Sequence, residues 1–140
     1  AGEGAGQYRQ AEDIIVNGGV QFAQIDVGRI GGITAAFRVR QLCEERGGQY
    51  VNHTFKSHLS VAASLHVFAT NAAFGLCEYP AAGSALSEGI ASHVERDADG
   101  MVFAPDEPGL GVTVDIDAVR EFHAPVRIEV GGTALGFDAP

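Results

Sequence analysis

The sequence has few cysteines, few cations and no long apolar run, and each shortage excludes a class of protein. Only 2 of its 140 residues are cysteines, too few for the disulfide framework of a small secreted domain. Its 9 Lys and Arg residues face 18 Asp and Glu residues, and the net charge of −9 argues against a nucleic acid partner. No apolar stretch approaches the ~18 residues of a membrane-spanning helix, and no signal peptide is visible.

The composition that is present is typical of a soluble globular chain. A hydrophobic content of 46% is enough for a core, and the length is that of one domain or of a piece of something larger. The chain begins with Ala1 rather than Met, so its first residue need not be a natural start. Cys43 falls in a predicted helix and Cys77 in a predicted strand, which favours two buried thiols in a reducing cytoplasm over a disulfide.

Glycine-rich turns divide the first 80 residues into alternating helices and strands. Such alternation is typical of an α/β fold, in which a parallel sheet is joined by right-handed crossovers. We predict Thr34 as the N-cap of the second helix. The predicted helices are 7–16, 35–46 and 57–71, and the predicted strands are 20–27, 49–52 and 74–78.

Four ionisable residues follow one another at the ends of short apolar runs. Glu3, Asp26, His53 and Glu78 are separated by 23, 27 and 25 residues. One strand, helix and connecting loops together need roughly 25 to 30 residues, so these side chains are predicted at the carboxyl ends of consecutive strands. That edge carries the chemistry in parallel sheets and barrels. The glycines between Asp26 and Thr34 do not form a dinucleotide-binding loop, because the G-x-G-x-x-G pattern is missing.

The alternation stops after residue 80, so we divide the chain into 1–80 and 81–140. Residues 81–96 are predicted to be mixed and loop-like, 97–111 rich in turns, 115–122 a helix capped by Asp115 or Asp117, 126–130 a strand, and the last ten residues a loose tail. Three or four βα units make only half of an eight-unit barrel. The sheet of such a half has two unpaired edges, which need another strand or segment to cover them. The rest of the barrel must come from another chain or from a longer form of this one.

The order and spacing of several short motifs resemble the enolase superfamily, in the mandelate racemase subgroup of the mandelate racemase and muconate lactonizing enzyme family. The motifs are Ala-Gly-Glu3, Ile25-Asp26-Val-Gly-Arg29-Ile-Gly-Gly-Ile-Thr34, Asn52-His53-Thr-Phe, Leu76-Cys-Glu78, Asp99-Gly-Met-Val-Phe-Ala-Pro105 and Pro108-Gly-Leu-Gly111. The resemblance implies the C-terminal half of a modified (β/α) TIM-type barrel. It also implies that residues 81–140 return toward a capping domain, which this chain lacks.

The same resemblance implies Mg²⁺-dependent abstraction of the proton α to a carboxylate, through an enediolate. Glu3 would be the last of three carboxylate metal ligands, His53 the general base or acid, and Asp26 its partner. Glu78 would hydrogen-bond the substrate carboxylate. The other two metal carboxylates and the lysine acid/base motif belong upstream of Glu3, so we expect this chain alone neither to bind Mg²⁺ tightly nor to turn over substrate.

The residue types also fit this chemistry without the family. Mg²⁺ prefers oxygen ligands, which Glu3 can supply, and a histidine titrates near neutral pH. An Asp26 carboxylate that accepts the Nδ1 proton of His53 would fix the tautomer and raise the basicity of the ring. We expect Arg29 to form a structural ion pair, and Lys56 could contact an anionic substrate. Each residue also has an ordinary structural explanation. The remaining histidines are assigned to helix packing or to the surface: His58, His66, His93 and His123.

We therefore predict an acid-sugar dehydratase, or a related racemase or epimerase, acting on a small carboxylate substrate. The alternative is an inactive half-barrel that serves as an assembly or binding module and needs a complementary chain. The expected partner is the N-terminal half of the barrel, with no membrane or nucleic acid partner. We also expect a cytoplasmic homo-oligomer, since open sheet edges disfavour an isolated monomer.

Overall fold

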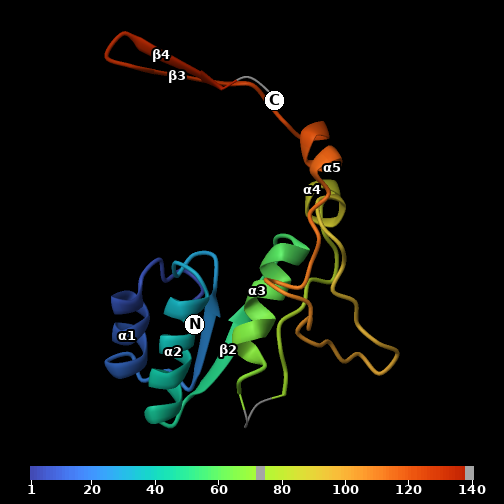
Figure 1. Cartoon of the computed structure of the whole chain (residues 1–140). Helices are drawn as coiled ribbons and strands as arrows, with labels where there is room; N and C mark the ends of the chain where they lie inside the picture. The colour runs from blue at the N-terminus through green and yellow to red at the C-terminus, as the bar shows by residue number, and fades with distance from the viewer. Residues whose placement is uncertain (72–74, 138–140) are drawn as a thin grey trace.

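The computed structural model describes residues 1–71 and 75–137 (Figure 1). Its first part alternates helices and strands, and its last part ends in a hairpin. Within the described residues no helix is long and apolar enough to cross a membrane. The elements are α1 (Tyr8–Val16), β1 (Phe22–Asp26), α2 (Ile33–Glu45), β2 (Gln49–His53), α3 (His58–Phe68), α4 (Ala85–Gly89), α5 (Ile116–Glu121), β3 (Val126–Val130) and β4 (Thr133–Phe137).

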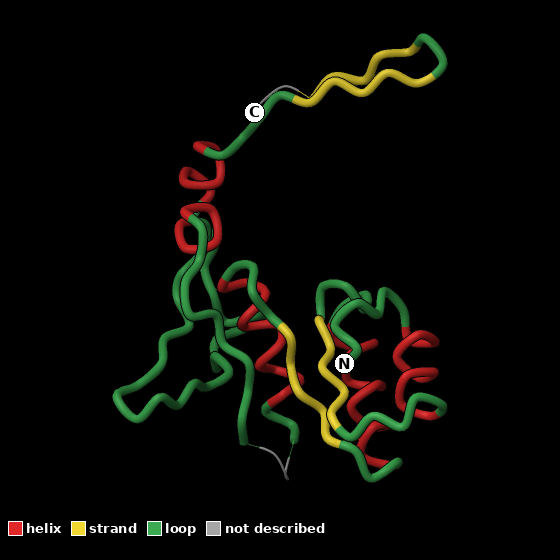
Figure 2. The backbone as a smooth tube through the Cα atoms, turned by 180° about the vertical axis from the view of Figure 1, so that it is seen from behind, coloured by secondary structure: helices red, strands yellow, loops and turns green. Residues whose placement is uncertain are grey.

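The centre of the first part is a parallel strand pair joined by a helix. Strands β1 and β2 pair in parallel, so that Asp26 at the end of β1 lies opposite His53 at the end of β2. Ala1 lies along the free edge of β1, where its carbonyl accepts a hydrogen bond of 2.8 Å from the Gln24 N–H. Figures 1 and 2 show α1, α2 and α3 on one side of this strand pair. The predicted parallel α/β arrangement is therefore confirmed for these elements.

Apolar side chains fill the space between the strand pair and its helices. Fully buried examples are Ile25 in β1 and Val39 in α2, and their periodicity, two in strands and about 3.6 in helices, is what the sequence shows. The predicted helices 7–16, 35–46 and 57–71 are confirmed, with ends that differ by a few residues. The main cluster contains Ala5, Ala11, Ile15, Ala23, Ile25, Val27, Ile30, Ala36, Val39, Cys43, Tyr50, Val67 and Phe68.

The start of α2 differs from the prediction. Thr34 is already the second residue of the helix, and the N-cap is Gly32, which has φ 107° and offers no side-chain cap. Gly31 has φ 101°. Because only glycine adopts such conformations readily, the turn after Asp26 depends on these two glycines rather than on a hydroxyl cap.

The predicted strand 74–78 is wrong for its described part, since residues 75–78 form no strand; Phe74 lies outside the described residues. Instead of backbone–backbone hydrogen bonds between β2 and this segment, the side chain of Asn52 bonds to the backbone of Glu78. Its Nδ2 donates to the Glu78 carbonyl at 2.8 Å, and its Oδ1 accepts from the Glu78 N–H at 2.9 Å. The segment therefore runs beside β2 without the repeated backbone bonds of a strand.

Two elements in the second half were missed. Residues 81–96, predicted to be loop-like, contain α4, in which Ser84 accepts a hydrogen bond from the Ser87 N–H as N-cap. The tail, predicted to be loose, contains β4, which pairs antiparallel with β3. Strand 126–130 is confirmed, and so is helix 115–122, because α5 begins after Asp115, whose carboxylate accepts from the Ala118 N–H.

Side chains between Val94 and Val112 pack against α3, which also contacts α2 and β2. This second cluster explains why α3 is apolar around its whole circumference. Its buried members are Val61, Ala62, Leu65 and Val94, with Cys77, Tyr79, Val102, Ala104, Leu110 and Val112 at its margin.

The two thiols are free, as predicted. Cys43 is buried in α2, whereas Cys77 is only partly buried and lies in the non-strand segment. Burial raises the pKa of both thiols, which leaves them protonated near neutral pH.

Candidate active site

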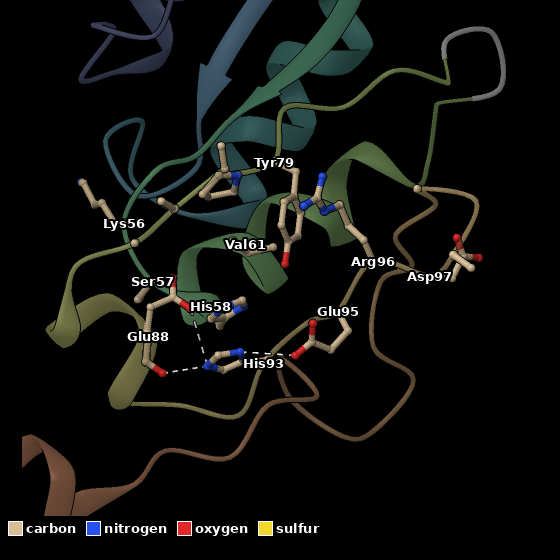
Figure 3. A pocket seen from close by; sticks show the side chains of 16 residues that line it. Lys56, Ser57, His58, Val61, Tyr79, Glu88, His93, Glu95, Arg96 and Asp97 are labelled. Atoms are coloured by element: carbon tan, nitrogen blue, oxygen red, sulfur yellow. Dashed lines mark hydrogen bonds and ion pairs between the residues drawn. The ribbon is translucent and has the colours of Figure 1, made fainter.

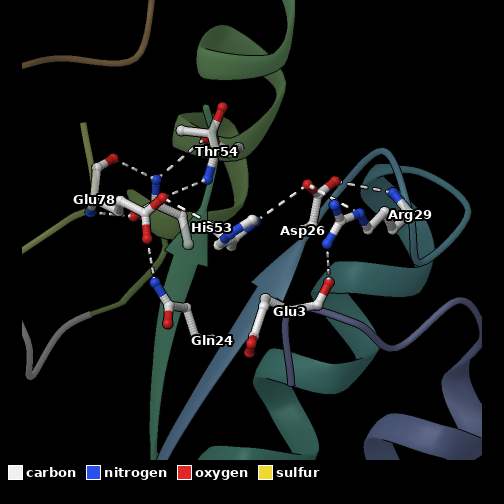
Figure 4. A network of polar contacts seen from close by, with 9 residues as sticks. Glu3, Gln24, Asp26, Arg29, His53, Thr54 and Glu78 are labelled. Atoms are coloured by element: carbon white, nitrogen blue, oxygen red, sulfur yellow. Dashed lines mark hydrogen bonds and ion pairs between the residues drawn. The ribbon is translucent and has the colours of Figure 1, made fainter. Parts of the chain in front are cut away.

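Asp26 and His53 meet at the carboxyl edge of the strand pair (Figure 4). His53 Nδ1 lies 3.2 Å from Asp26 Oδ2. The Asp26 side chain is 1% exposed and that of His53 is 14% exposed, so the contact is shielded from water. Their closeness follows from the parallel register, which places the two residues opposite each other.

The surroundings of Asp26 fix the orientation of the His53 ring. Asp26 Oδ1 accepts the Arg29 N–H at 2.9 Å, and Arg29 Nε lies 4.0 Å from Oδ2. An ionised carboxylate can only accept hydrogen bonds, so Nδ1 of His53 carries the shared proton. The opposite nitrogen, Nε2, is then left with a lone pair, which is the arrangement of a general base.

Glu78 lies on the other side of the His53 ring. Its Oε1 is 4.0 Å from His53 Nε2 and accepts the Thr54 N–H at 3.2 Å, while its Oε2 accepts from Gln24 Nε2. Together with the Asn52 amide described above, these bonds hold Glu78 beside the histidine (Figure 4).

Gln24 and Asn52 are the functional candidates that the sequence reasoning missed. Asn52 is fully buried and lies on the same face of β2 as buried Tyr50. A polar residue at a buried strand position must find a hydrogen-bond partner, and that signal could have indicated its role. Gln24 gives no comparable signal, because its position in β1 is only partly buried.

Glu3 approaches the same edge from the N-terminal turn. Its backbone carbonyl accepts a hydrogen bond of 3.0 Å from Arg29 Nη1, and its carboxylate is exposed. A bond from its own backbone N–H, with nearby positive charge including Arg29, lowers the pKa of the Glu3 carboxyl. An ionised carboxylate suits a hard cation. One such ligand does not make a magnesium site, so the described residues fit Mg²⁺ only as part of a larger ligand set.

Arg29 and Lys56 flank Phe55 beside this site. Arg29 Cζ lies 5.4 Å and Lys56 Nζ 5.8 Å from the centre of the Phe55 ring, and this ring packs edge-on against His53 at 5.1 Å. Arg29 is thus committed to Asp26, Glu3 and Phe55, as a structural cation would be. The contact of either cation with substrate stays a prediction.

A second polar cluster lies in a separate cavity of about 400 Å³ (Figure 3). The ligand atoms of His58, Glu88 and His93 lie within 4.8 Å of one another, the spacing of a metal site. The sequence reasoning placed His58 in helix packing and His93 at the surface; His58 is indeed buried and His93 is 40% exposed. Their approach to Glu88 was not foreseen, because it depends on α4.

The geometry of this cluster opposes metal binding. The two imidazole rings are stacked, 4.2 Å apart with an angle of 14° between their planes, so their in-plane lone pairs cannot converge on one ion. His58 Nδ1 accepts the Val94 N–H at 3.1 Å, which puts the ring proton on Nε2, the nitrogen that faces Glu88. A hydrogen bond to the Glu88 carbonyl, with Glu88 and Glu95 beside it, raises the pKa of His93, and this favours a protonated ring.

Comparisons with known proteins find a matching family model, sequence relatives and similar solved structures. The family model described as enolase C-terminal domain-like matches residues 1–119. A D-galactonate dehydratase family member from Catenulispora acidiphila is 30% identical over 86% of this chain and 28% of its own. A D-mannonate dehydratase from a Sphingomonas species is 31% identical over 81% of this chain and 28% of its own.

Among solved structures, a predicted mandelate racemase from Rhodobacter sphaeroides superposes with a TM-score of 0.90 at 42% identity. The match covers 99% of this chain and 36% of that one. The chain therefore spans about a third of the length of the proteins that it matches.

Proposed function

The chain belongs to the enolase C-terminal domain-like family, and from this premise we propose that it is the C-terminal part of an acid-sugar dehydratase. Its fold is a portion of a (β/α) barrel of the enolase superfamily, as predicted. The reaction would begin with removal of the proton α to the substrate carboxylate. Loss of the hydroxyl from the neighbouring carbon would follow, and the resulting enol would become a 2-keto-3-deoxy acid.

His53 is the proposed base. Its Nε2 carries the lone pair, because Nδ1 donates to Asp26 at 3.2 Å, and its ring is accessible enough, at 14%, for a substrate to reach it. As the ring takes up the α-proton, the buried Asp26 carboxylate stabilises the positive charge that develops. The same group, once protonated, can return a proton to the departing hydroxyl.

Glu78 and Lys56 are the proposed substrate contacts. Glu78 lies 4.0 Å from His53 Nε2, so a substrate whose α-carbon is next to this nitrogen would bring its carboxylate close to Glu78. Lys56 is exposed beside Phe55 and is free to pair with an anionic or hydroxylated substrate. Arg29 positions Asp26 through its backbone N–H, and any contact of its own with substrate is secondary.

Magnesium is the proposed cofactor of the complete protein, with Glu3 as one of its ligands. When bound, the ion would stabilise the negative charge of the enediolate on the substrate carboxylate. The exposed carboxylate and lowered pKa of Glu3 support this role.

We also propose a cytoplasmic location for the complete protein, which the two free thiols support.

The single observation that carries this proposal is the hydrogen-bonded Asp26–His53 pair at the edge where the parallel strands end. A suitable test uses the complete protein with Mg²⁺ and a panel that includes D-galactonate and D-mannonate, the substrates named in its relatives. The measurement is formation of 2-keto-3-deoxy acid, together with exchange of the substrate α-proton in D₂O by NMR.

We expect His53→Asn to lower turnover by about 10²- to 10⁴-fold, the contribution of a general base, and to abolish exchange. His66→Asn is the matched control, since His66 bonds to the Leu110 carbonyl away from the site. Exchange without a keto-deoxy product would indicate a racemase or epimerase. Unchanged exchange in the His53 variant would exclude His53 as the base.

A further inference from the structure

The β3–β4 hairpin projects from the body of the molecule (Figures 1 and 2). A two-residue turn, Gly131-Gly132, joins the strands, with φ of 58° and 79°. This is the geometry of a tight hairpin, in which both turn residues have positive φ. Every residue of β3 is exposed, so no part of the described chain covers it. The match to the family model ends at residue 119, before the hairpin begins.

A two-stranded hairpin is at best marginally stable alone in water. This one also exposes a row of apolar side chains on one face of β3: Val126 is 49%, Ile128 46% and Val130 70% exposed. Arg127 and Glu129 lie on the opposite face, where Arg127 Nη2 is 3.9 Å from Glu129 Oε2. Such a strand is a template for pairing with another strand.

The sequence of β3 is complementary to itself. If two copies pair antiparallel about Ile128, Arg127 of each lies opposite Glu129 of the other, and Val126 lies opposite Val130. Opposite charges that face each other across strands stabilise pairing, as do facing β-branched residues. Both contacts then occur twice, as a twofold axis requires.

The backbone of β3 allows the same register. In a two-residue hairpin the residues that flank the turn, here Val130 and Thr133, exchange both hydrogen bonds, and bonded and non-bonded pairs alternate from there. Val126, Ile128 and Val130 therefore direct their backbone groups toward β4, in the register that the strands show. The free edge presents the N–H and C=O groups of Arg127 and Glu129, the two residues that pair across the proposed axis.

We propose that the β3 strands of two copies of this chain pair antiparallel about Ile128 and join the two hairpins into one four-stranded sheet. The hairpin is thus an interface between subunits, separate from the Asp26–His53 site. This pairing gives each hairpin the additional strands that it lacks alone.

Charge reversal tests this pairing in the complete protein, by native mass and sedimentation. Arg127→Glu places two Glu–Glu pairs across the axis, and Glu129→Arg places two Arg–Arg pairs there. Each variant alone should self-associate through this interface about tenfold or more weakly. An equimolar mixture should recover the association, because the reversed charge at position 127 of one variant then faces the opposite, reversed charge at position 129 of the other. The ion pair within one hairpin cannot produce this recovery, since each variant has lost it.

A cross-link provides a second, independent measurement. Ile128→Cys would lie opposite its own copy at a non-hydrogen-bonded position, where Cα atoms are ~4.5 Å apart and a disulfide can form. Mild oxidation should give a covalent dimer on a non-reducing gel. Ile116→Cys, on α5 and 57% exposed, is the matched control and should remain uncross-linked, as should the parent protein with Cys43 and Cys77.

Two outcomes would overturn the proposal. One is absence of both the cross-link and the recovery in the mixture. The other is a lower melting temperature for the charge variants with unchanged native mass, which would show that the hairpin packs instead against an upstream part of its own chain.

Discussion

At the scale of single residues, the burial of Asp26 is the feature on which the proposed role of His53 as a base depends. A carboxylate that is 1% exposed is costly unless its oxygens are hydrogen-bonded. Here one oxygen accepts the Arg29 N–H and the other meets the His53 ring. Because both oxygens have partners, the charge can stay buried and hold the imidazole in one tautomer.

Asp26→Asn should therefore lower turnover of the complete protein by about 10²-fold or more while leaving the fold intact. The asparagine keeps the shape, but its amide can donate to Nδ1, and Nε2 then carries the ring proton and cannot accept another. Asp13→Asn, on the exposed face of α1, is the control. The measurements are kcat and the far-UV circular dichroism spectrum, and parent-like kcat in the Asp26 variant would remove Asp26 from the mechanism.

The positions of Asp26, His53 and Glu78 could be predicted because strand ends recur at regular intervals in a βα repeat. The structure does bring these three residues together. The Gln24 and Asn52 contacts could not be predicted in the same way, since they join side chains to a segment 54 and 26 residues away. Spacing along the chain contains no information about such individual hydrogen bonds.

At the scale of elements, helices were easier to predict than strands. Helices α1 and α2 are closely followed by glycines, Gly18 and Gly47, and carry an apolar face, both visible locally. A strand exists only if a neighbouring backbone pairs with it, and residues 75–78 meet a side chain, Asn52, instead. The short helix α4 and the strand β4 were missed because neither has a long periodic pattern.

Asn52→Ala should destabilise the chain by about 1–3 kcal/mol, because it leaves the backbone N–H and C=O of Glu78 without their partners. It should also lower turnover of the complete protein, since Glu78 would no longer be held beside His53. Asn17→Ala is a matched control: the Asn17 side chain donates to Asp13 in α1, and its loss should cost less than about 1 kcal/mol. Urea denaturation measures both; equal stability of the two variants would contradict the role given to Asn52.

At the scale of the whole molecule, the chain is one part of a barrel. Within the described residues the parallel sheet has two strands, and the chain spans about a third of the proteins that it matches. In the proposed enzyme, Glu3 would supply one metal ligand at the open edge, and further ligands would come from outside these 140 residues. The division at residue 80 and the packing of residues 81–140 on a capping domain remain predictions.

The isolated chain should accordingly bind Mg²⁺ weakly, with no saturation at micromolar concentrations. A single exposed carboxylate offers too few oxygens to replace the water around this ion. Isothermal titration calorimetry of the 140-residue chain, with the complete protein as positive control, measures this. Micromolar binding that survives Glu3→Gln would point to a different metal site.

The parallel ladder of β1 and β2 ends on the Asp26–His53 rung, so ordinary backbone hydrogen bonds set the alignment of these two side chains. Inserting or deleting one residue inside either strand would invert the facing of everything beyond it and turn one partner of the pair away. A change of length in the loops that follow these strands would leave the alignment of the pair intact, whereas a change in the number of residues within either strand would destroy it.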